Sequence, residues 1–340
     1  MPIALEASFA AAKTEPDGTP RYLSHDEIAQ RARALEEAGY IGLFTAETNV
    51  EPFLPLAIAA GATDRVELGT SIAIELARSP MTTAQVAHQL HGLSRGRFVL
   101  GLGSQIRPHI TRRFGMPWDR PIARMEAHID SIQAIWRTWR EGTPLQVRND
   151  FFTIDLMPPA FFPPRHEHPD PRIMLAAVGP AMTRLAARKA DGIFAHGYTT
   201  ADYLANVTIP TIENELAAHG RDRSEFRIQG SMLAAMGSTD EELEKATDVL
   251  RHRVSFYSST PSYHRVLAHH GWEDLGHDLH RMSKSDDPLR WDKMADVVPD
   301  EVLNAFGIIG TPTQVRDEAQ RRFGGLVDRL HGDSLLSSAQ

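Results

Sequence analysis

Several side chains that could transfer protons or bind ligands lie in, or directly after, the apolar segments of this 340-residue chain. Glu47 follows the apolar segment 41–45, and His109 follows the apolar segment 98–102. A carboxylate can act as a general acid or base when burial raises its pKa toward neutrality, and an imidazole titrates near neutral pH. Other candidates occupy similar places: Glu6, Thr70, Ser71, Gln105, Arg107, Gly179 and His196. This placement predicts that function lies at the ends of strands.

The elements that must position these residues alternate between strand and helix signals along the whole chain. Eight strands are predicted, at residues 3–9, 41–45, 66–74, 98–102, 172–178, 192–195, 226–235 and 305–309. Helices are predicted at residues 24–38, 53–62, 82–93, 123–139, 180–190, 201–219, 240–250 and 312–323. The first helix begins at Ser24, which has Glu27 three residues later and therefore fits a capping box.

Eight strands that alternate with helices favour an α/β fold of the (β/α)8 TIM-barrel type over a doubly wound sheet. In such a barrel, functional residues lie on loops at the C-terminal ends of the strands. We interpret residues 1–340 as a single domain with two insertions, at about residues 145–171 and 251–296. The first is rich in proline and contains a hairpin-like run at 151–154, whereas helical signals at 240–250 give way to an irregular stretch. Both insertions would cover the barrel mouth as lids.

Composition excludes several classes of protein. The chain is 42% hydrophobic and 24% charged, and its net charge of -8 argues against a protein that mainly binds nucleic acid. It has no cysteine, which excludes disulfides, thiolate nucleophiles and cysteine-ligated metals. No apolar run of membrane-spanning length is present, so we expect a cytoplasmic protein without a membrane partner.

Histidines gather late in the chain, at positions 252, 264, 269, 270, 277 and 280. His277 and His280 could share a helical face, which would suit two metal ligands. No HExxH pattern or matched carboxylate accompanies them. We therefore interpret them as incidental residues of a helical lid and expect no metal.

Residues 65–118 form a predicted β-α-β unit whose strand ends are rich in small and polar residues, which let a ligand approach the backbone closely. Four motifs carry a family resemblance: Gly69-Thr70-Ser71, Arg78-Ser79-Pro80, the run from Leu93 to Gly103, and Ala190-Asp191-Gly192. Together they resemble the bacterial luciferase-like monooxygenase superfamily, whose fold is a (β/α)8 barrel with insertions. Residues 105–109 and 113–118 resemble its deazaflavin-dependent branch, which uses coenzyme F420.

The resemblance implies two contacts with a flavin-like cofactor. A non-prolyl cis peptide at Ser71-Ile72 would form a bulge that supports the ring; the alternative is a plain strand end. Gly179-Pro180-Ala181 opens a helix whose free N–H groups could hold the cofactor phosphate, and Thr183 could add a hydroxyl. The alternative there is an ordinary strand-to-helix turn.

The remaining candidates also have structural alternatives. Gln105, Arg107 and His109 lie on a charged loop, where His109 could exchange a proton and Arg107 could hold an anion; the alternative is a solvated loop. Glu47 and Glu6 could act as acids or bases, or form structural salt bridges. His196 could line the pocket or be a buried, hydrogen-bonded histidine.

The resemblance thus predicts hydride transfer between coenzyme F420 and a small organic substrate, in a homodimer. One alternative is an FMN-dependent monooxygenase of the same fold, and another is a flavin-binding barrel without turnover. The residues after Glu47, Thr48-Asn49-Val50, lack the acid-His pair of several deazaflavin dehydrogenases. This departure leaves the proton-transfer residue open.

Overall fold

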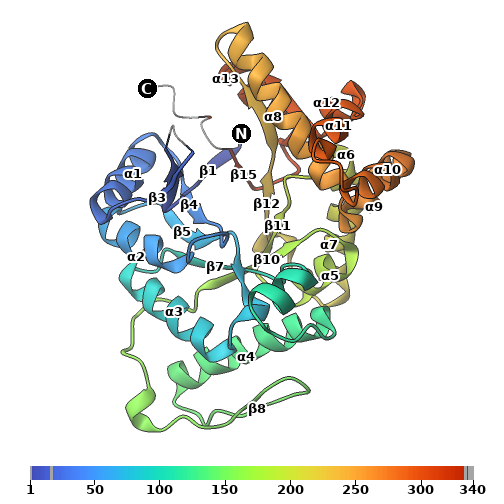
Figure 1. Cartoon of the computed structure of the whole chain (residues 1–340). Helices are drawn as coiled ribbons and strands as arrows, with labels where there is room; N and C mark the ends of the chain where they lie inside the picture. The colour runs from blue at the N-terminus through green and yellow to red at the C-terminus, as the bar shows by residue number, and fades with distance from the viewer. Residues whose placement is uncertain (1, 16–17, 333–334, 336–340) are drawn as a thin grey trace. The chain divides into compact units, whose positions relative to one another are not determined.

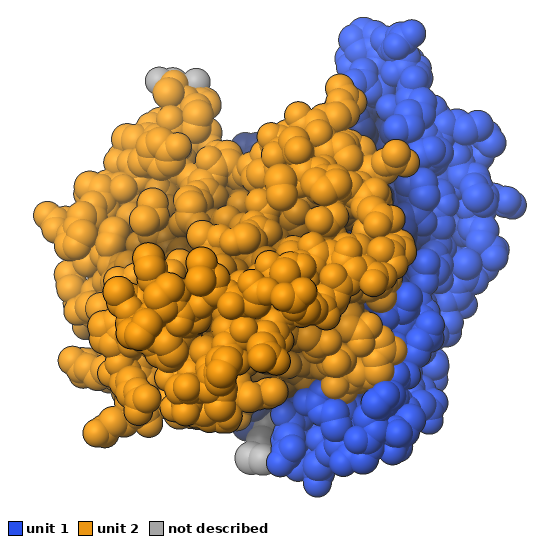
Figure 2. Space-filling view, turned by 90° about the horizontal axis from the view of Figure 1, so that it is seen from below, with its two compact units in different colours: residues 1–5, 177–184, 194–340 blue, residues 6–176, 185–193 orange. Residues whose placement is uncertain are grey.

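The structure is a computed structural model that describes residues 2–15, 18–332 and 335, and its strands and helices alternate along the chain (Figure 1). The chain divides into two compact units, which Figure 2 colours separately. Unit 2 comprises residues 6–176 and 185–193, and unit 1 comprises residues 1–5, 177–184 and 194–340.

Unit 2 is built on parallel strands with helices between them. Its strands are β1 (Ala4–Ser8), β4 (Gly42–Thr45), β5 (Glu67–Thr70), β6 (Ala73–Ile74), β7 (Phe98–Gly103) and β10 (Arg172–Ala177). The connecting helices are α1 (His25–Glu37), α2 (Phe53–Ala62), α3 (Pro80–Leu93) and α4 (Pro121–Glu141). Every residue of β7 is buried, as expected for a parallel strand that is covered on both faces.

Unit 1 contains two parallel strand pairs and a set of helices. β12 (Arg227–Ser231) pairs with β15 (Arg329–His331), and β13 (Leu233–Met236) pairs with β14 (Gly307–Gly310). Its helices are α6 (Ala201–Tyr203), α7 (Ile209–Ala218), α8 (Asp240–Ser258), α9 (His264–His269), α10 (Glu273–Ser283), α11 (Arg290–Asp296), α12 (Asp300–Phe306) and α13 (Pro312–Phe323). Four elements include residues of both units: α5 (Pro180–Lys189), β11 (Gly192–Ala195), β1 through residues 4–5, and β10 through Ala177.

The main sheet has the order β10-β11-β12-β15-β1-β4-β5-β7, with β6 next to β7, and β10 also pairs with β7. A sheet whose end strands pair is closed into a barrel. With eight main strands and helices between them, the fold is the predicted (β/α)8 TIM barrel.

Local signals placed several helices correctly. The capping box of α1 forms as predicted, because Ser24 Oγ accepts from Glu27 N at 3.2 Å and Glu27 Oε2 accepts from Ser24 N at 2.8 Å. The hairpin in the first insertion is also present, as β8 (Val147–Arg148) paired antiparallel with β9 (Thr153–Ile154). A second hairpin joins β2 (Ala12–Thr14) to β3 (Pro20–Tyr22).

The prediction that residues 305–309 form the last barrel strand was wrong. Residues 305 and 306 end α12, and β14 begins at Gly307 and pairs with β13 in a separate two-stranded sheet. The eighth barrel strand is β15, which has three residues, of which only Leu330 is buried. So short a strand gives no apolar run, and so the sequence analysis missed it.

Four other predicted elements differ in extent or regularity. The strand predicted at 66–74 is broken into β5 and β6, and the strand predicted at 226–235 is divided into β12 and β13. The helix predicted at 201–219 contains a π-helical turn, Leu204–Thr208, just before Pro210, which has no N–H to donate. The helix predicted at 240–250 continues to Ser258, and the stretch after it contains regular helices rather than irregular chain. Within the described ranges, no helix is both long and apolar enough to cross a membrane.

Candidate active site

Glu47 lies in unit 2, directly after β4, where the end of that strand meets the β5–β6 segment. Its backbone N–H donates to Ile72 O at 3.1 Å, and its Oε2 accepts from Ile74 N at 2.6 Å. Arg78 Nη2 lies 3.0 Å from the same Oε2. Two contacts therefore hold one oxygen of the carboxylate, a third holds the backbone of Glu47, and the side chain is only 8% exposed.

Burial controls the acidity of Glu47. It raises the pKa of the carboxyl group above its usual value and outweighs the Ile74 N–H and Arg78, which both lower the pKa. In the part of the chain that the structure describes, Oε1 has no hydrogen-bond partner. Glu47 thus combines a held oxygen with a second oxygen that could give or take a proton.

Arg78 is a site residue that the sequence analysis used only as part of a family motif. It follows the 3-10 turn Glu75–Ala77 and bridges two carboxylates, Glu47 at 3.0 Å and Glu51 at 3.3 Å. Its guanidinium also lies 5.3 Å from the centre of the Phe53 ring. The Glu47–Arg78 contact joins residues that are far apart in the sequence, and no local sequence pattern predicts it.

The peptide bond between Ser71 and Ile72 is cis, as predicted. Ser71 N donates to Thr45 O at 2.6 Å, which holds this segment against the end of β4. On its other side, a Cβ added at Gly103 would lie 2.7 Å from Ile72 Cδ1. The Ile72 side chain therefore requires a glycine at the end of β7.

Thr70, another predicted cofactor contact, uses its hydroxyl within the protein. Thr70 Oγ1 donates to Gly101 O at 2.7 Å and accepts from Gly101 N at 2.9 Å, and the residue is fully buried. The hydroxyl thus bridges β5 and β7 beyond their last paired residues, Gly69 and Val99.

Gln105, Arg107 and His109 follow β7 as predicted. Gln105 has a φ of 57° and turns the chain, and His109 begins a π-helical turn, His109–Arg113. Arg113 donates to Thr48 O, which links this turn to the loop after Glu47. The Arg107 and His109 side chains are exposed and have no ion pair or side-chain hydrogen bond to any described residue. Both are free to meet a ligand.

Two further carboxylates of unit 2 are fully buried. Glu6, a predicted catalytic candidate, lies opposite Gly42 in the β1–β4 register, and a Cβ at Gly42 would be 3.2 Å from Glu6 Cγ. Glu75, which the sequence analysis did not single out, lies 2.8 Å from His128 Nδ1 and accepts from Thr83 Oγ1 at 2.8 Å. The Glu75–His128 pair links the turn after β6 to α4.

In unit 1, Gly179 precedes α5 as predicted. Its carbonyl oxygen accepts from Thr183 N at 3.0 Å and from Thr183 Oγ1 at 3.1 Å, so the hydroxyl of this buried threonine turns into the helix. A Cβ at Gly179 would lie 2.8 Å from Nη1 of Arg265. The exposed Arg265 guanidinium has no hydrogen bond or ion pair within the described ranges. A cation thus lies beside the turn that opens α5, and the sequence analysis missed it.

His196 follows β11 and uses both ring nitrogens within unit 1. Nδ1 accepts from Tyr198 N at 2.9 Å, so the proton of the neutral ring is on Nε2, which lies 3.2 Å from Tyr263 Oη. Burial, assisted by Arg253, lowers the pKa of His196 to about 4. The imidazole is therefore neutral at pH 7 and orients Tyr263.

One described group has ligand atoms close enough for a metal ion: Asp202, His269 and His270. His269 Nε2 lies 2.5 Å from Asp202 Oδ2, and His270 Nε2 lies 2.9 Å from Thr200 Oγ1. Each imidazole thus has a partner within the protein. The expectation of no metal stays a prediction.

Comparison with known proteins identifies the family. Residues 7–329 match the family described as luciferase-like monooxygenase, and the chain belongs to this family. It is 43% identical over 302 residues to an uncharacterized Mycobacterium tuberculosis protein, Rv1360, covering 89% of this chain and 88% of the relative. It is 27% identical over 307 residues to Rv3520c of the same organism, provisionally named a coenzyme F420-dependent oxidoreductase, with 85% of each chain covered.

Solved structures agree on the fold. The F420-dependent tetrahydromethanopterin reductase of Methanopyrus kandleri gives a TM-score of 0.73 at 18% identity and covers 97% of this chain and 93% of its own. A Baeyer-Villiger monooxygenase of Pseudomonas putida in complex with FMN gives 0.65 at 15% identity, covering 97% and 91%. The fold therefore accommodates both F420-dependent and FMN-dependent enzymes.

Proposed function

We propose that this protein is an oxidoreductase that transfers a hydride between coenzyme F420 and a small organic substrate. The observation that carries the proposal is Glu47: a carboxylate at the C-terminal end of a barrel strand, with a raised pKa and an Oε1 that has no hydrogen-bond partner among the described residues. Hydride addition to a carbonyl or imine leaves a heteroatom that must take a proton, and a carboxyl group with a raised pKa is suited to supply it.

The residues of unit 1 suit the anionic part of such a cofactor. The first turn of an α-helix offers N–H groups that have no intrahelical partner, Pro180 occupies the first position of α5, and Arg265 lies beside Gly179. We propose that Gly179, Pro180, Ala181 and Arg265 hold the cofactor phosphate. Thr183 contributes by fixing the Gly179 carbonyl. When bound, the deazaflavin ring supplies the hydride chemistry.

The residues of unit 2 suit the ring and the substrate. We propose that Ser71 and Ile72 support the ring and that Thr70 acts through its backbone, because its hydroxyl is already engaged. Arg78 orients Glu47, whose Oε1 gives or takes the proton. The free side chains of Arg107 and His109 bind polar groups of the ligand.

A second candidate is an FMN-dependent monooxygenase. The family description and the FMN-bound structural neighbour support it. Oxygen activation by reduced FMN does not itself explain a carboxylate with a raised pKa at this position, which is why we favour hydride transfer. A barrel that binds a flavin without turnover is a third candidate.

Anaerobic turnover separates these candidates. The purified protein is mixed with reduced F420 and a panel of ketones, imines and enones under nitrogen, and oxidation of the cofactor is followed by absorbance. The proposal predicts oxidation without oxygen for at least one compound and its loss in Glu47→Gln. Oxygen consumption with reduced FMN, and no anaerobic reaction, would establish the monooxygenase alternative. If the wild type and Glu47→Gln are both inert with each cofactor while binding it, the non-catalytic alternative holds.

A further inference from the structure

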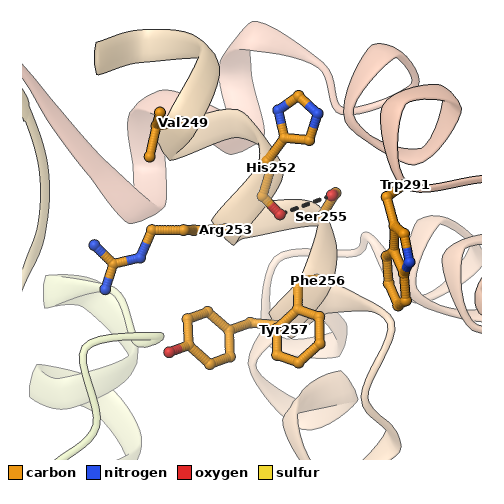
Figure 3. A pocket seen from close by; sticks show the side chains of 7 residues that line it. All are labelled: Val249, His252, Arg253, Ser255, Phe256, Tyr257 and Trp291. Atoms are coloured by element: carbon orange, nitrogen blue, oxygen red, sulfur yellow. Dashed lines mark hydrogen bonds between the residues drawn. The ribbon is translucent and has the colours of Figure 1, made fainter. Parts of the chain in front are cut away.

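A cavity of about 380 Å³ lies on unit 1, between α8 and α11 (Figure 3). Seven residues line it: Val249, His252, Arg253, Ser255, Phe256, Tyr257 and Trp291. Its volume falls in the range of small-molecule sites in proteins. No sequence motif predicted it, because its lining comes from one helix and from a tryptophan far along the chain.

Aromatic and aliphatic side chains form the walls. The ring centres of Phe256 and Trp291 are 5.8 Å apart, and those of Phe256 and Tyr257 are 5.6 Å apart. Phe256 is 51% exposed and Val249 is 61% exposed. Exposed apolar side chains that line a surface cavity indicate a binding site.

The walls are held in place by a contact between the two helices. His252 Nε2 of α8 lies 3.1 Å from Asp292 Oδ1 of α11. The backbone oxygen of Asp248 and the Asp292 carboxylate raise the pKa of His252. His252 is therefore already paired with an anion and is not the group that would attract a charged ligand.

Arg253 is the unpaired charge of the cavity. Among the described residues, none forms a hydrogen bond or ion pair with its guanidinium, although the charge helps to lower the pKa of His196. Figure 3 shows the guanidinium of Arg253 and the hydroxyl of Tyr257 extending toward the same side, while the rings of Phe256 and Trp291 lie toward the other. The cavity thus has a cationic end and an aromatic end.

We propose that this cavity binds an organic anion with a flat apolar ring. The ring packs against the adjacent side chains of Phe256 and Trp291, and a carboxylate accepts hydrogen bonds from Arg253 and from the Tyr257 hydroxyl. The Tyr257 ring stands edge-on to His196 at 5.0 Å, which connects the cavity to a residue that follows a barrel strand. That the anion is the substrate of the oxidoreductase rests on the proposed function; the binding itself does not.

The charge of Arg253 makes a specific comparison possible. The probe is naphthalene-2-carboxylate, with naphthalene-2-methanol as its neutral counterpart, and binding to the cofactor-free protein is followed by tryptophan fluorescence. The carboxylate binds at least about tenfold more tightly than the alcohol. Arg253→Gln removes this preference, whereas Arg33→Gln, another exposed arginine on α1, keeps it. In Trp291→Phe, most of the change in tryptophan fluorescence on probe binding is lost.

The aromatic end has its own test. Phe256→Ala weakens the binding of both probes by about tenfold, whereas Leu54→Ala, at an apolar residue that is 69% exposed on α2, leaves it unchanged. Equal affinity for the two probes, or unchanged affinity in Arg253→Gln, overturns the proposal. The proposal is also overturned if the wild type is a dimer that binds neither probe and Phe256→Ala is a monomer. A second copy of the chain would then be the occupant of the cavity. Folding of each variant is checked by circular dichroism.

A parallel titration with coenzyme F420 distinguishes the two claims. If F420 binds but neither naphthalene probe does, the cavity proposal fails and the proposed function stands. If the carboxylate binds selectively but F420 does not, the proposed function fails and the anion site stands.

Discussion

At the residue scale, Glu47 shows how burial and a few contacts set the character of a carboxylate. Its place after a strand made it predictable, because barrel function gathers at strand ends. Its partner Arg78 was used only as part of a family motif, and Arg265 beside Gly179 was missed altogether, since both contacts depend on how distant segments fold together. Sequence singled out the candidate residues for chemistry but not the residues that hold them in position.

Replacement of Glu47 by glutamine tests its role. Because the amide cannot transfer a proton, Glu47→Gln lowers kcat by about 100-fold or more while F420 affinity changes by less than about threefold. Glu51→Gln is the matched control, since Glu51 also contacts Arg78 but is 42% exposed. Full activity in Glu47→Gln would assign the proton transfer to another residue.

The pH dependence of kcat gives a second test of Glu47. Burial raises the pKa of Glu47 above the value of 4.5 that is usual for an exposed glutamate, so the group gains its proton at a higher pH. In the direction that needs a base, kcat therefore falls as pH drops through this raised pKa, and the loss begins above pH 4.5. A kcat profile whose only acidic limb lies at or below 4.5 would contradict the assignment.

Gly179 provides a test of the proposed site for the cofactor phosphate. A Cβ there would lie 2.8 Å from Arg265 Nη1 and displace the guanidinium, so Gly179→Ala weakens F420 binding by about tenfold, as expected for the loss of a charged hydrogen bond. Gly61→Ala is the control, because a Cβ at Gly61 has nothing within 4 Å. Isothermal titration calorimetry measures both. Equal affinities would remove Gly179 and Arg265 from the cofactor site.

At the element scale, caps and apolar periodicity predicted the helices of unit 2 well, as the capping box of α1 shows. They did not predict the π-helical turn before Pro210 or the interruption between β5 and β6, because both arise where a special backbone group breaks a regular pattern. They also gave no sign of how α3 is joined to the first insertion. There, rings of His88 and His91 lie next to His166 and His168.

This histidine group makes the stability of unit 2 depend on pH. His91 is 3% exposed, Nδ1 lies 3.1 Å from Phe98 O, and Nε2 is buried with no partner among the described residues. Burial, with added repulsion from His166 and His168, lowers the pKa of His91 from 6.5 to about 4. The unfolded chain therefore binds the proton first, and stability is lost as pH falls from about 6.5 toward 4, by up to about 3 kcal/mol.

Thermal unfolding at pH 7.5 and pH 5 measures this effect. The wild type loses more thermal stability between the two pH values than His91→Gln, because glutamine has no proton to gain. His25→Gln serves as the control: because the His25 side chain is 74% exposed, this variant loses as much thermal stability between the two pH values as the wild type. The same pH dependence in the wild type and His91→Gln would show that another group is responsible.

At the scale of the whole molecule, the alternation of strands and helices sufficed to predict a barrel. It misplaced the last barrel strand, because β15 has too few apolar residues to be recognised and residues 305–309 gave a stronger signal in the wrong place. Counting eight units was therefore correct, although one strand was misplaced. The cavity on α8 and α11 was invisible, because surface hollows depend on side chains that only the folded chain brings together.

The expected homodimer is a property of the whole molecule as well. Sedimentation equilibrium should give twice the chain mass of 37.8 kDa. A single species of one chain mass at all concentrations would contradict it.

The central claim is that this barrel uses coenzyme F420, and paired titrations with F420 and FMN test it most directly. Quenching of tryptophan fluorescence is followed for each cofactor under the same conditions. We expect saturable, tight binding of F420 and binding of FMN that is at least about tenfold weaker, a difference of about 1.4 kcal/mol. Tighter binding of FMN, or binding of neither, would contradict it.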